Sequence, residues 1–140
     1  MKNSYRFALS IAYTVHNKQV DLSGKPYINH PLHVAASVKG KKAKIVALLH
    51  DTVEDSDITI DYLKKYFSAD ICDAVNHLTR KPNETYDAYI ENIKKCPLAR
   101  IVKIKDLEHN MDIKRLDKLN ENDYSRLQKY LNAYWRLKYE

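Results

Sequence analysis

The sequence predicts an all-α protein, with one compact domain over residues 1–140 built from about seven or eight helices. Only two glycines occur in the chain, and hairpin-rich β folds need glycine at their tight turns. No segment keeps the alternation of apolar and polar residues that is typical of a half-buried strand. The chain has 140 residues, of which 44% are hydrophobic and 30% charged, and this is enough for a single folded core.

Apolar residues at helical spacing divide the first half of the chain into five helices. The first of these repeats Phe7 and Ile11 one turn apart. Pro31 suits the first position of the second helix, and Thr59 or Ser56 suits the N-cap of the fourth. The expected segments are residues 3–16, a loop over 21–26, and helices over 32–38, 42–55, about 62–67 and 68–78.

Three further helices are expected in the second half. They cover residues 84–96, 97 to about 116, and a last stretch from Asn120 or Asn122 nearly to 140. The apolar residues of the last helix recur at spacings of three and four, which predicts a packing stripe against the core or against a second subunit. One hypothesis is therefore a homo-oligomer formed through this helix, and the alternative is that the stripe packs into the core. The members of the stripe are Leu127, Tyr130, Leu131, Tyr134 and Trp135.

Charge and cysteine content indicate which partners and which compartment suit the protein. Lysine and arginine number 24 and aspartate and glutamate 18, so the formal net charge is +6, which suits an anionic partner such as a nucleotide, nucleic acid or phosphate. Cys72 and Cys96 form no metal-type pair and are expected to be reduced, buried thiols of a cytoplasmic protein. No run approaches the roughly 20 apolar residues of a membrane span, and no signal peptide is recognisable.

Four residues stand out as candidate metal ligands: His30, the adjacent pair His50 and Asp51, and Asp106. His50 and Asp51 end an apolar run over residues 45–49, where polar groups cost free energy unless they are paired or coordinated. Asp106 lies in a helix with apolar residues on several sides. Imidazole and carboxylate together suit a divalent ion such as Mn²⁺, Fe²⁺ or Zn²⁺.

Each of these residues, taken alone, also fits an ordinary role as a hydrogen-bonded core histidine, a helix cap or a surface acid. On a helix over 42–55, however, Glu54 would share a face with His50, and Asp55 with Asp51, at a spacing of four. We therefore expect two further carboxylates beside the ion, with a solvated helix end as the alternative.

Several strings resemble the HD-domain metal-dependent phosphohydrolases, and in particular the hydrolase domain of the RelA/SpoT enzymes and their small stand-alone relatives. The strings are YINHP at 27–31, ALLHDTVED at 47–55, HNKQ at 16–19 with the Ser-Gly at 23–24, and VKIKDLEHNM at 102–111. The resemblance covers about residues 10–116 and implies the HD-domain fold. Members of that family remove the 3′-diphosphate from ppGpp and pppGpp.

Carried over position by position, the resemblance makes His30, His50, Asp51 and Asp106 the metal ligands, with Mn²⁺ as the expected ion. It makes Glu54 and Asp55 the catalytic acids. Its substrate-binding candidates are Asn110, Ser23 and Arg80, the last of them for phosphate, although a solvated loop is the alternative for Arg80.

The sequence departs from the family pattern where the base of the nucleotide is expected to bind. The alarmone hydrolases carry an Arg-Lys pair before the Ser-Gly, and the arginine packs on the guanine, whereas this chain has Asp21 and Leu22. A stacking cation has been replaced by an acid that cannot stack. Lys103 and Lys105 are expected to be solvated or paired along their helix, and His33, His77 and His109 to be structural, with His109 also able to support the site.

The leading hypothesis is a metal-dependent phosphohydrolase of a phosphorylated nucleotide, most closely a (p)ppGpp-like 3′-pyrophosphohydrolase that releases pyrophosphate. The ion would activate a water and hold a phosphate oxygen, while Glu54 and Asp55 position the water or move its proton. Three alternatives stay open: the same chemistry on another nucleotide, an HD domain that binds without cleaving, and a basic helical nucleic-acid-binding protein, for which no recognised binding signature is present.

Overall fold

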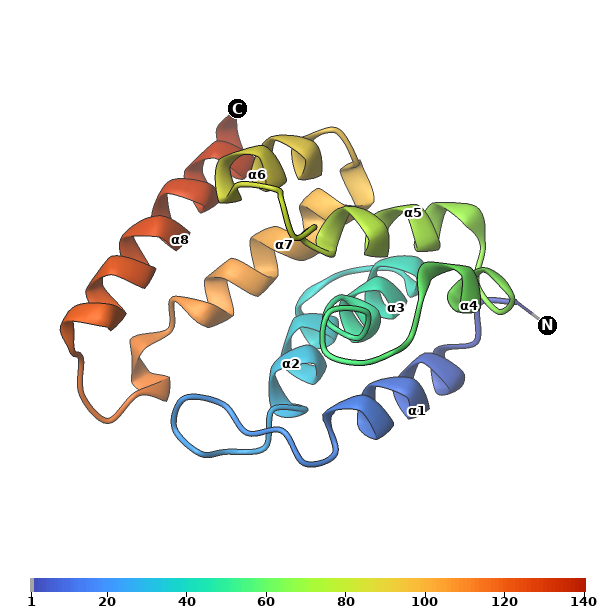
Figure 1. Cartoon of the computed structure of the whole chain (residues 1–140), viewed down its shortest axis with the longest axis horizontal. Helices are drawn as coiled ribbons and strands as arrows, with labels where there is room; N and C mark the ends of the chain where they lie inside the picture. Colours follow the sequence, from blue (N-terminus) through green and yellow to red (C-terminus); the bar gives the residue numbers. More distant parts are fainter. Residues whose placement is uncertain (1) are drawn as a thin grey trace.

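The computed structural model describes residues 2–140 and consists, over that range, of eight α-helices and one short 3₁₀ helix without a strand (Figure 1). All-α was therefore the right fold class. The elements are α1 (Tyr5–His16), α2 (Asn29–Ser37), α3 (Lys41–Leu49), α4 (Ile60–Lys64), α5 (Ala69–Leu78), α6 (Tyr86–Lys94), α7 (Pro97–Asn110), η1 (Ile113–Arg115) and α8 (Glu121–Tyr139).

Polar caps begin four of the helices. The side chains of Ser4, Thr59 and Thr85 accept hydrogen bonds from the first turns of α1, α4 and α6. At α8, Asn120 and Asp123 form a reciprocal capping box, in which each side chain accepts from the backbone N–H of the other. The expected caps at Thr59 and Asn120 are thus confirmed.

Helix α3 forms the centre of the core. Six of its nine residues are buried, including the whole run from Ile45 to Leu49, and it contacts α1, α2, α5 and α7. A helix that is apolar on nearly all sides has to be surrounded by other helices. Figure 1 shows α3 enclosed by α1, α2, α5 and α7, so its C-terminal end, at His50, lies inside the protein.

The structure ends α3 at Leu49, whereas the sequence predicted a helix to residue 55. Side chains compete here for the helix carbonyls. His50 Nδ1 lies 2.6 Å from the carbonyl oxygen of Ala47, and the Thr52 hydroxyl donates to that of Leu49 at 2.8 Å. Residues 50–55 consequently form a series of turns.

Helix α7 also ends earlier than expected, at Asn110 instead of about residue 116. The backbone N–H of Asp112 donates to the carbonyl of His109, and the Asp112 carboxylate then caps η1 by accepting from Lys114. This turn sends η1 towards the loop between α1 and α2, and Figure 1 shows the two segments next to each other.

Helix α8 packs along α7, but only part of its predicted stripe faces inward. Ala133 and Leu137 are buried, and Tyr130 and Tyr134 pack against the core. Leu131 is 42% exposed and Trp135 is 48% exposed, so the prediction was wrong for these two as core residues. Within residues 2–140, no helix combines the length and the apolar composition needed to cross a bilayer.

Candidate metal centre

His30 enters the site from the first turn of α2, where it is 2% exposed. Its Nε2 lies 2.7 Å from Asp106 Oδ1, and its Nδ1 lies 2.7 Å from Nδ1 of His109. Burial and the nearby Arg115 cation lower the pKa of His109 to about 4, so this ring is neutral and can accept. The His109 ring therefore accepts the Nδ1 proton of His30 and leaves His30 Nε2 facing the acid.

His50 comes from the end of α3 and is also 2% exposed. Its Nδ1 proton is donated to Ala47, which leaves Nε2 as the basic nitrogen. Nε2 lies 3.1 Å from Asp51 Oδ2 and 3.3 Å from Asp106 Oδ1, yet it makes no hydrogen bond of acceptable geometry within the described residues. A buried nitrogen without a hydrogen bond, placed between two carboxylates, is in a position to bind a proton or a metal cation.

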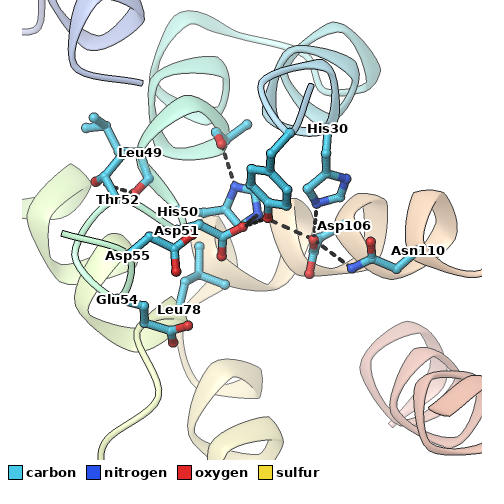
Figure 2. A network of polar contacts seen from close by, with 12 residues as sticks. His30, Leu49, His50, Asp51, Thr52, Glu54, Asp55, Leu78, Asp106 and Asn110 are labelled. Atoms are coloured by element: carbon cyan, nitrogen blue, oxygen red, sulfur yellow. Dashed lines mark hydrogen bonds and ion pairs between the residues drawn. The ribbon is translucent and has the colours of Figure 1, made fainter. Parts of the chain in front are cut away.

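Asp106 projects from the middle of α7 and is 3% exposed. The Lys103 ammonium contacts Oδ2 at 2.8 Å. The Asn110 amide donates to Oδ1 at 3.2 Å, as Figure 2 shows. Burial alone would raise the pKa of Asp106, but Lys103, His30 and His50 hold it well below its usual range. The carboxylate is therefore ionised, as a metal ligand has to be.

The three side chains meet closely enough to hold one ion. One ligand atom each from His30, His50 and Asp106 lies within 4.8 Å of the others. Asp51 stands just outside this group, next to His50, and its Oδ2 accepts from the Tyr27 hydroxyl. The set of two imidazoles and a carboxylate, with a second carboxylate beside it, fits a divalent metal ion.

Glu54 and Asp55 lie on the turns that follow His50, on the solvent-accessible side of the centre (Figure 2). The Glu54 carboxylate accepts from the backbone N–H of Arg80 at 2.5 Å, and the Asp55 carboxylate from the amide of Gln19 at 3.2 Å. Partial burial, with Asp51 nearby, raises the pKa of both acids. They lie on turns and not on the continuous helix that the sequence predicted.

The three substrate-binding candidates separate into two places. Ser23 and Asn110 line a cavity of about 300 Å³ beside the centre. Arg80 lies away from that cavity: its guanidinium sits over the ring of Tyr86, and it reaches the centre through its backbone contact with Glu54.

Three neighbours of the centre were not assigned to it by sequence reasoning. Tyr27 was quoted within a motif without a role, and it holds Asp51. Arg115 contributes to the cavity beside the centre. Lys103 and Lys105 are paired along α7, as expected, but the Lys103 side chain is only 11% exposed and its partner is the ligand candidate Asp106. The signal available was the spacing of three between Lys103 and Asp106 on an apolar helix.

A helical fold in which the start of α2, the end of α3 and the interior of α7 bring histidines and aspartates together in the core is typical of a class of metal-binding domains. A comparison with known protein families supports this class, because the sequence model of the family described as the HD domain matches residues 8–134. The chain belongs to the HD-domain family.

Curated relatives are longer proteins. The chain is 34% identical over 116 residues to a guanosine-3′,5′-bis(diphosphate) 3′-pyrophosphohydrolase of Haemophilus influenzae, with 72% of this chain and 17% of the relative covered. It is 33% identical over 139 residues to a GTP pyrophosphokinase of Myxococcus xanthus, with 86% and 18% covered. The chain thus spans less than a fifth of the length of either relative.

A solved structure, described as a metazoan ortholog of SpoT that hydrolyzes ppGpp, superimposes with a TM-score of 0.78. The match covers 96% of this chain and 85% of the other, at 24% sequence identity. This likeness establishes the HD-type helical fold.

Proposed function

We propose that this chain is a metal-dependent phosphohydrolase that acts on a phosphorylated nucleotide, as a (p)ppGpp-like 3′-pyrophosphohydrolase. The observation that carries the proposal is the buried Nε2 of His50, which has no hydrogen bond and faces Asp106 and Asp51. The substrate class is that named for the Haemophilus relative and for the similar metazoan protein. Residues 1–140 would form a single domain of this kind.

In this proposal His30, His50, Asp51 and Asp106 hold the ion, with Mn²⁺ as the metal. A bound divalent ion supplies Lewis acidity to a phosphate oxygen and lowers the pKa of water at the site. The neighbouring groups keep the ligands in their binding states: Lys103 keeps Asp106 ionised, and His109 and Ala47 take the Nδ1 protons of the two histidines.

Glu54 and Asp55 carry out the proton transfer. Their carboxylates are held by Arg80 and Gln19 at the open side of the centre, where a water can enter. One of them takes the proton of the water as its oxygen attacks the phosphorus bonded to the 3′ oxygen. The bond from that phosphorus to the 3′ oxygen breaks, the 3′ oxygen receives a proton, and pyrophosphate leaves.

Asn110, Ser23 and Arg80 are the proposed substrate contacts. Asn110 donates to Asp106 and lines the cavity with Ser23, so the nucleoside would lie there with its 3′ side towards the metal. Arg80, over Tyr86 and next to Glu54, would contact phosphate from the other side of the acids.

One observation supports a different nucleotide as substrate. Asp21 and Leu22 line the cavity in place of the basic pair of the alarmone hydrolases. Hydrolysis of another phosphorylated nucleotide at the same metal centre is therefore the second candidate function.

We also propose that the protein is cytoplasmic. Cys72 and Cys96 are buried free thiols, which supports this location.

We further propose that the protein associates with itself through α8. The exposed side chains of Leu131, Trp135 and Tyr139 on this helix support the proposal. Light scattering of the wild type and of Trp135→Ser tests this: a dimer in the first and a monomer in the second is expected.

Product analysis with Mn²⁺ tests the activity. The purified protein would be offered ppGpp, pppGpp, NADPH, and ordinary nucleoside di- and triphosphates, and pyrophosphate and orthophosphate would be measured separately. Release of pyrophosphate from ppGpp supports the leading proposal, and phosphate release from another nucleotide supports the second. Turnover of none of them, together with salt-sensitive DNA binding, would instead support a nucleic-acid-binding protein.

A further inference from the structure

The cavity lies beside the metal centre and shares residues with it. Two of its lining residues also belong to the centre: Tyr27 holds Asp51, and Asn110 holds Asp106. Its walls are the loop between α1 and α2, the segment after α7, and the first half of α8. With a volume of about 300 Å³, it is of the size that takes a small organic group. The part of a substrate that does not react would therefore bind here.

Arg115, from η1, places a cation in this cavity. Its Nη1 donates to the carbonyl oxygen of His109 at 3.0 Å and to Asn110 Oδ1 at 3.4 Å. Its Nη2 lies 3.6 Å from Asp21 Oδ2. Nη1 is thus held by protein acceptors and Nη2 faces a carboxylate, while the side chain remains 25% exposed.

Asp21 is itself held rigidly. Its Oδ1 accepts from the backbone N–H groups of Ser23 and Lys25, at 2.9 and 3.0 Å, in a tight turn that Gly24 completes with a φ of 79°. The Ser23 hydroxyl donates to the carbonyl oxygen of Arg115, so the turn and η1 are joined at two points. The acid at position 21 therefore positions a cation that comes from the opposite wall.

The ligand of this cation follows from its surroundings. A phosphate is best held by free N–H donors and net positive charge, but Nη1 of Arg115 already donates to protein oxygens and Asp21 offsets the charge of the guanidinium. A flat guanidinium held in this way can still offer its face for stacking on an aromatic ring. The second cation of the lining, Arg126, is paired with Asp123. The apolar and aromatic part of the lining favours a flat ring; it consists of Val20, Leu22, Tyr27, Ile113, Leu116, Leu127 and Tyr130.

We propose that Arg115 binds the purine base of the nucleotide by stacking, with Asp21 as its positioning residue. The proposal rests on the proposed function, since it concerns the non-reacting part of the same substrate. It also explains how the chain can do without the arginine that the alarmone hydrolases carry before their Ser-Gly: the stacking cation is supplied by η1 instead.

Binding of GDP and of inorganic pyrophosphate in the presence of Mn²⁺, measured by calorimetry, tests it. We expect Arg115→Ala to weaken GDP binding about tenfold or more and to leave pyrophosphate binding unchanged. Arg115→Lys should not restore GDP binding, because an ammonium has no flat face. Asp21→Asn should weaken GDP binding by a smaller factor. Lys114→Ala, which alters a neighbouring side chain that is 86% exposed, is the matched control.

Two results would overturn the proposal. Arg115→Ala could bind GDP as tightly as the wild type, or it could lose GDP and pyrophosphate affinity by the same factor, which would make Arg115 a phosphate ligand. A wild type that binds no GDP would overturn it as well. Should Arg115→Ala not fold, Arg115→Gln keeps a donor for the His109 carbonyl and is measured in its place.

The same variants separate this inference from the proposed function. If the wild type cleaves ppGpp, Arg115→Ala should raise KM about tenfold with little change in kcat, because the base contact is equal in ground state and transition state. If the wild type binds GDP through Arg115 but cleaves no nucleotide, the proposed function fails and the inference stands. If the wild type cleaves ppGpp and Arg115→Ala changes neither KM nor kcat, the proposed function stands and the inference about Arg115 fails.

Discussion

The imidazoles of His30 and His109 lie side by side, with their planes 6° apart and their Nδ1 atoms 2.7 Å from each other. Two facing ring nitrogens share only one proton, so one ring donates and the other accepts. His109 is the acceptor because its pKa is lowered to about 4 by burial, Arg115 and the other histidines. The pair therefore sets the tautomer of His30.

His109→Ala is expected to weaken Mn²⁺ binding about 10- to 100-fold, because the Nδ1 proton of His30 loses its acceptor. Equilibrium dialysis or calorimetry with Mn²⁺ measures the effect. His77→Ala removes a histidine of α5 whose contacts are with Asp73, and it should leave Mn²⁺ affinity at the His30 centre unchanged. Equal affinities in the His109 variant and the wild type would show that the contact does not support the site.

Addition of Mn²⁺ should stabilise the protein, because the ion binds the folded state. At a hundred times its Kd the gain is about 2.7 kcal/mol, a rise in Tm on the order of 5–10 °C, and EDTA should reverse it. Asp51→Ala should abolish this rise and turnover, while Asp57→Ala, at an exposed acid on the same segment, should keep both. Full activity of Asp51→Ala would rule Asp51 out as a ligand.

Glu54→Gln should retain Mn²⁺ and lose turnover by about 100-fold or more, since the amide keeps the shape of the side chain and cannot take a proton. The measurements are kcat on the cleaved nucleotide and the Mn²⁺-dependent rise in Tm. Unchanged kcat would remove Glu54 from the mechanism, and loss of the Tm rise would place it among the metal ligands instead.

Lys103→Met should destabilise the protein by about 2–4 kcal/mol without metal, because it leaves the buried Asp106 carboxylate without its ammonium partner. Urea unfolding gives the free energy, and added Mn²⁺ should restore part of the loss by supplying positive charge to the same carboxylate. Lys105→Met is the control: its pair with Glu108 is more exposed and is worth less than about 1 kcal/mol. Similar losses in the free energy of unfolding for the two variants would show that Lys103 does not stabilise the buried Asp106 carboxylate more than a surface pair would.

Two leucines of α8 test which face of this helix belongs to the core. Leu137 is fully buried, so Leu137→Ala should cost about 2–5 kcal/mol in the free energy of unfolding. Leu131 is 42% exposed, so Leu131→Ala should change it by no more than about 0.5 kcal/mol. If the helix associates with a second subunit, the Leu131 variant should instead make the stability depend on protein concentration differently from the wild type.

Much of the fold could be predicted because local patterns carry it. The spacing of apolar residues located all eight α-helices, and the cap residues Thr59 and Asn120 located two of their starts. Helix ends were less predictable. The early end of α3 depends on His50 and Thr52 turning back to helix carbonyls, a competition that apolar periodicity does not register.

The sequence by itself determined the helical class, the buried end of α3 and the order of the ligand candidates, since each depends on residues close together in the chain or on a specific motif. Only the tertiary structure decided which side chains from other elements hold the groups of the site in position. The contacts of His109 with His30 and of Asp21 with Arg115 depend on how α2, α7, η1 and the loop after α1 meet in space. Electrostatic and hydrogen-bond contacts act over a few ångströms, and the distance between two residues along the chain does not state how far apart folding leaves them.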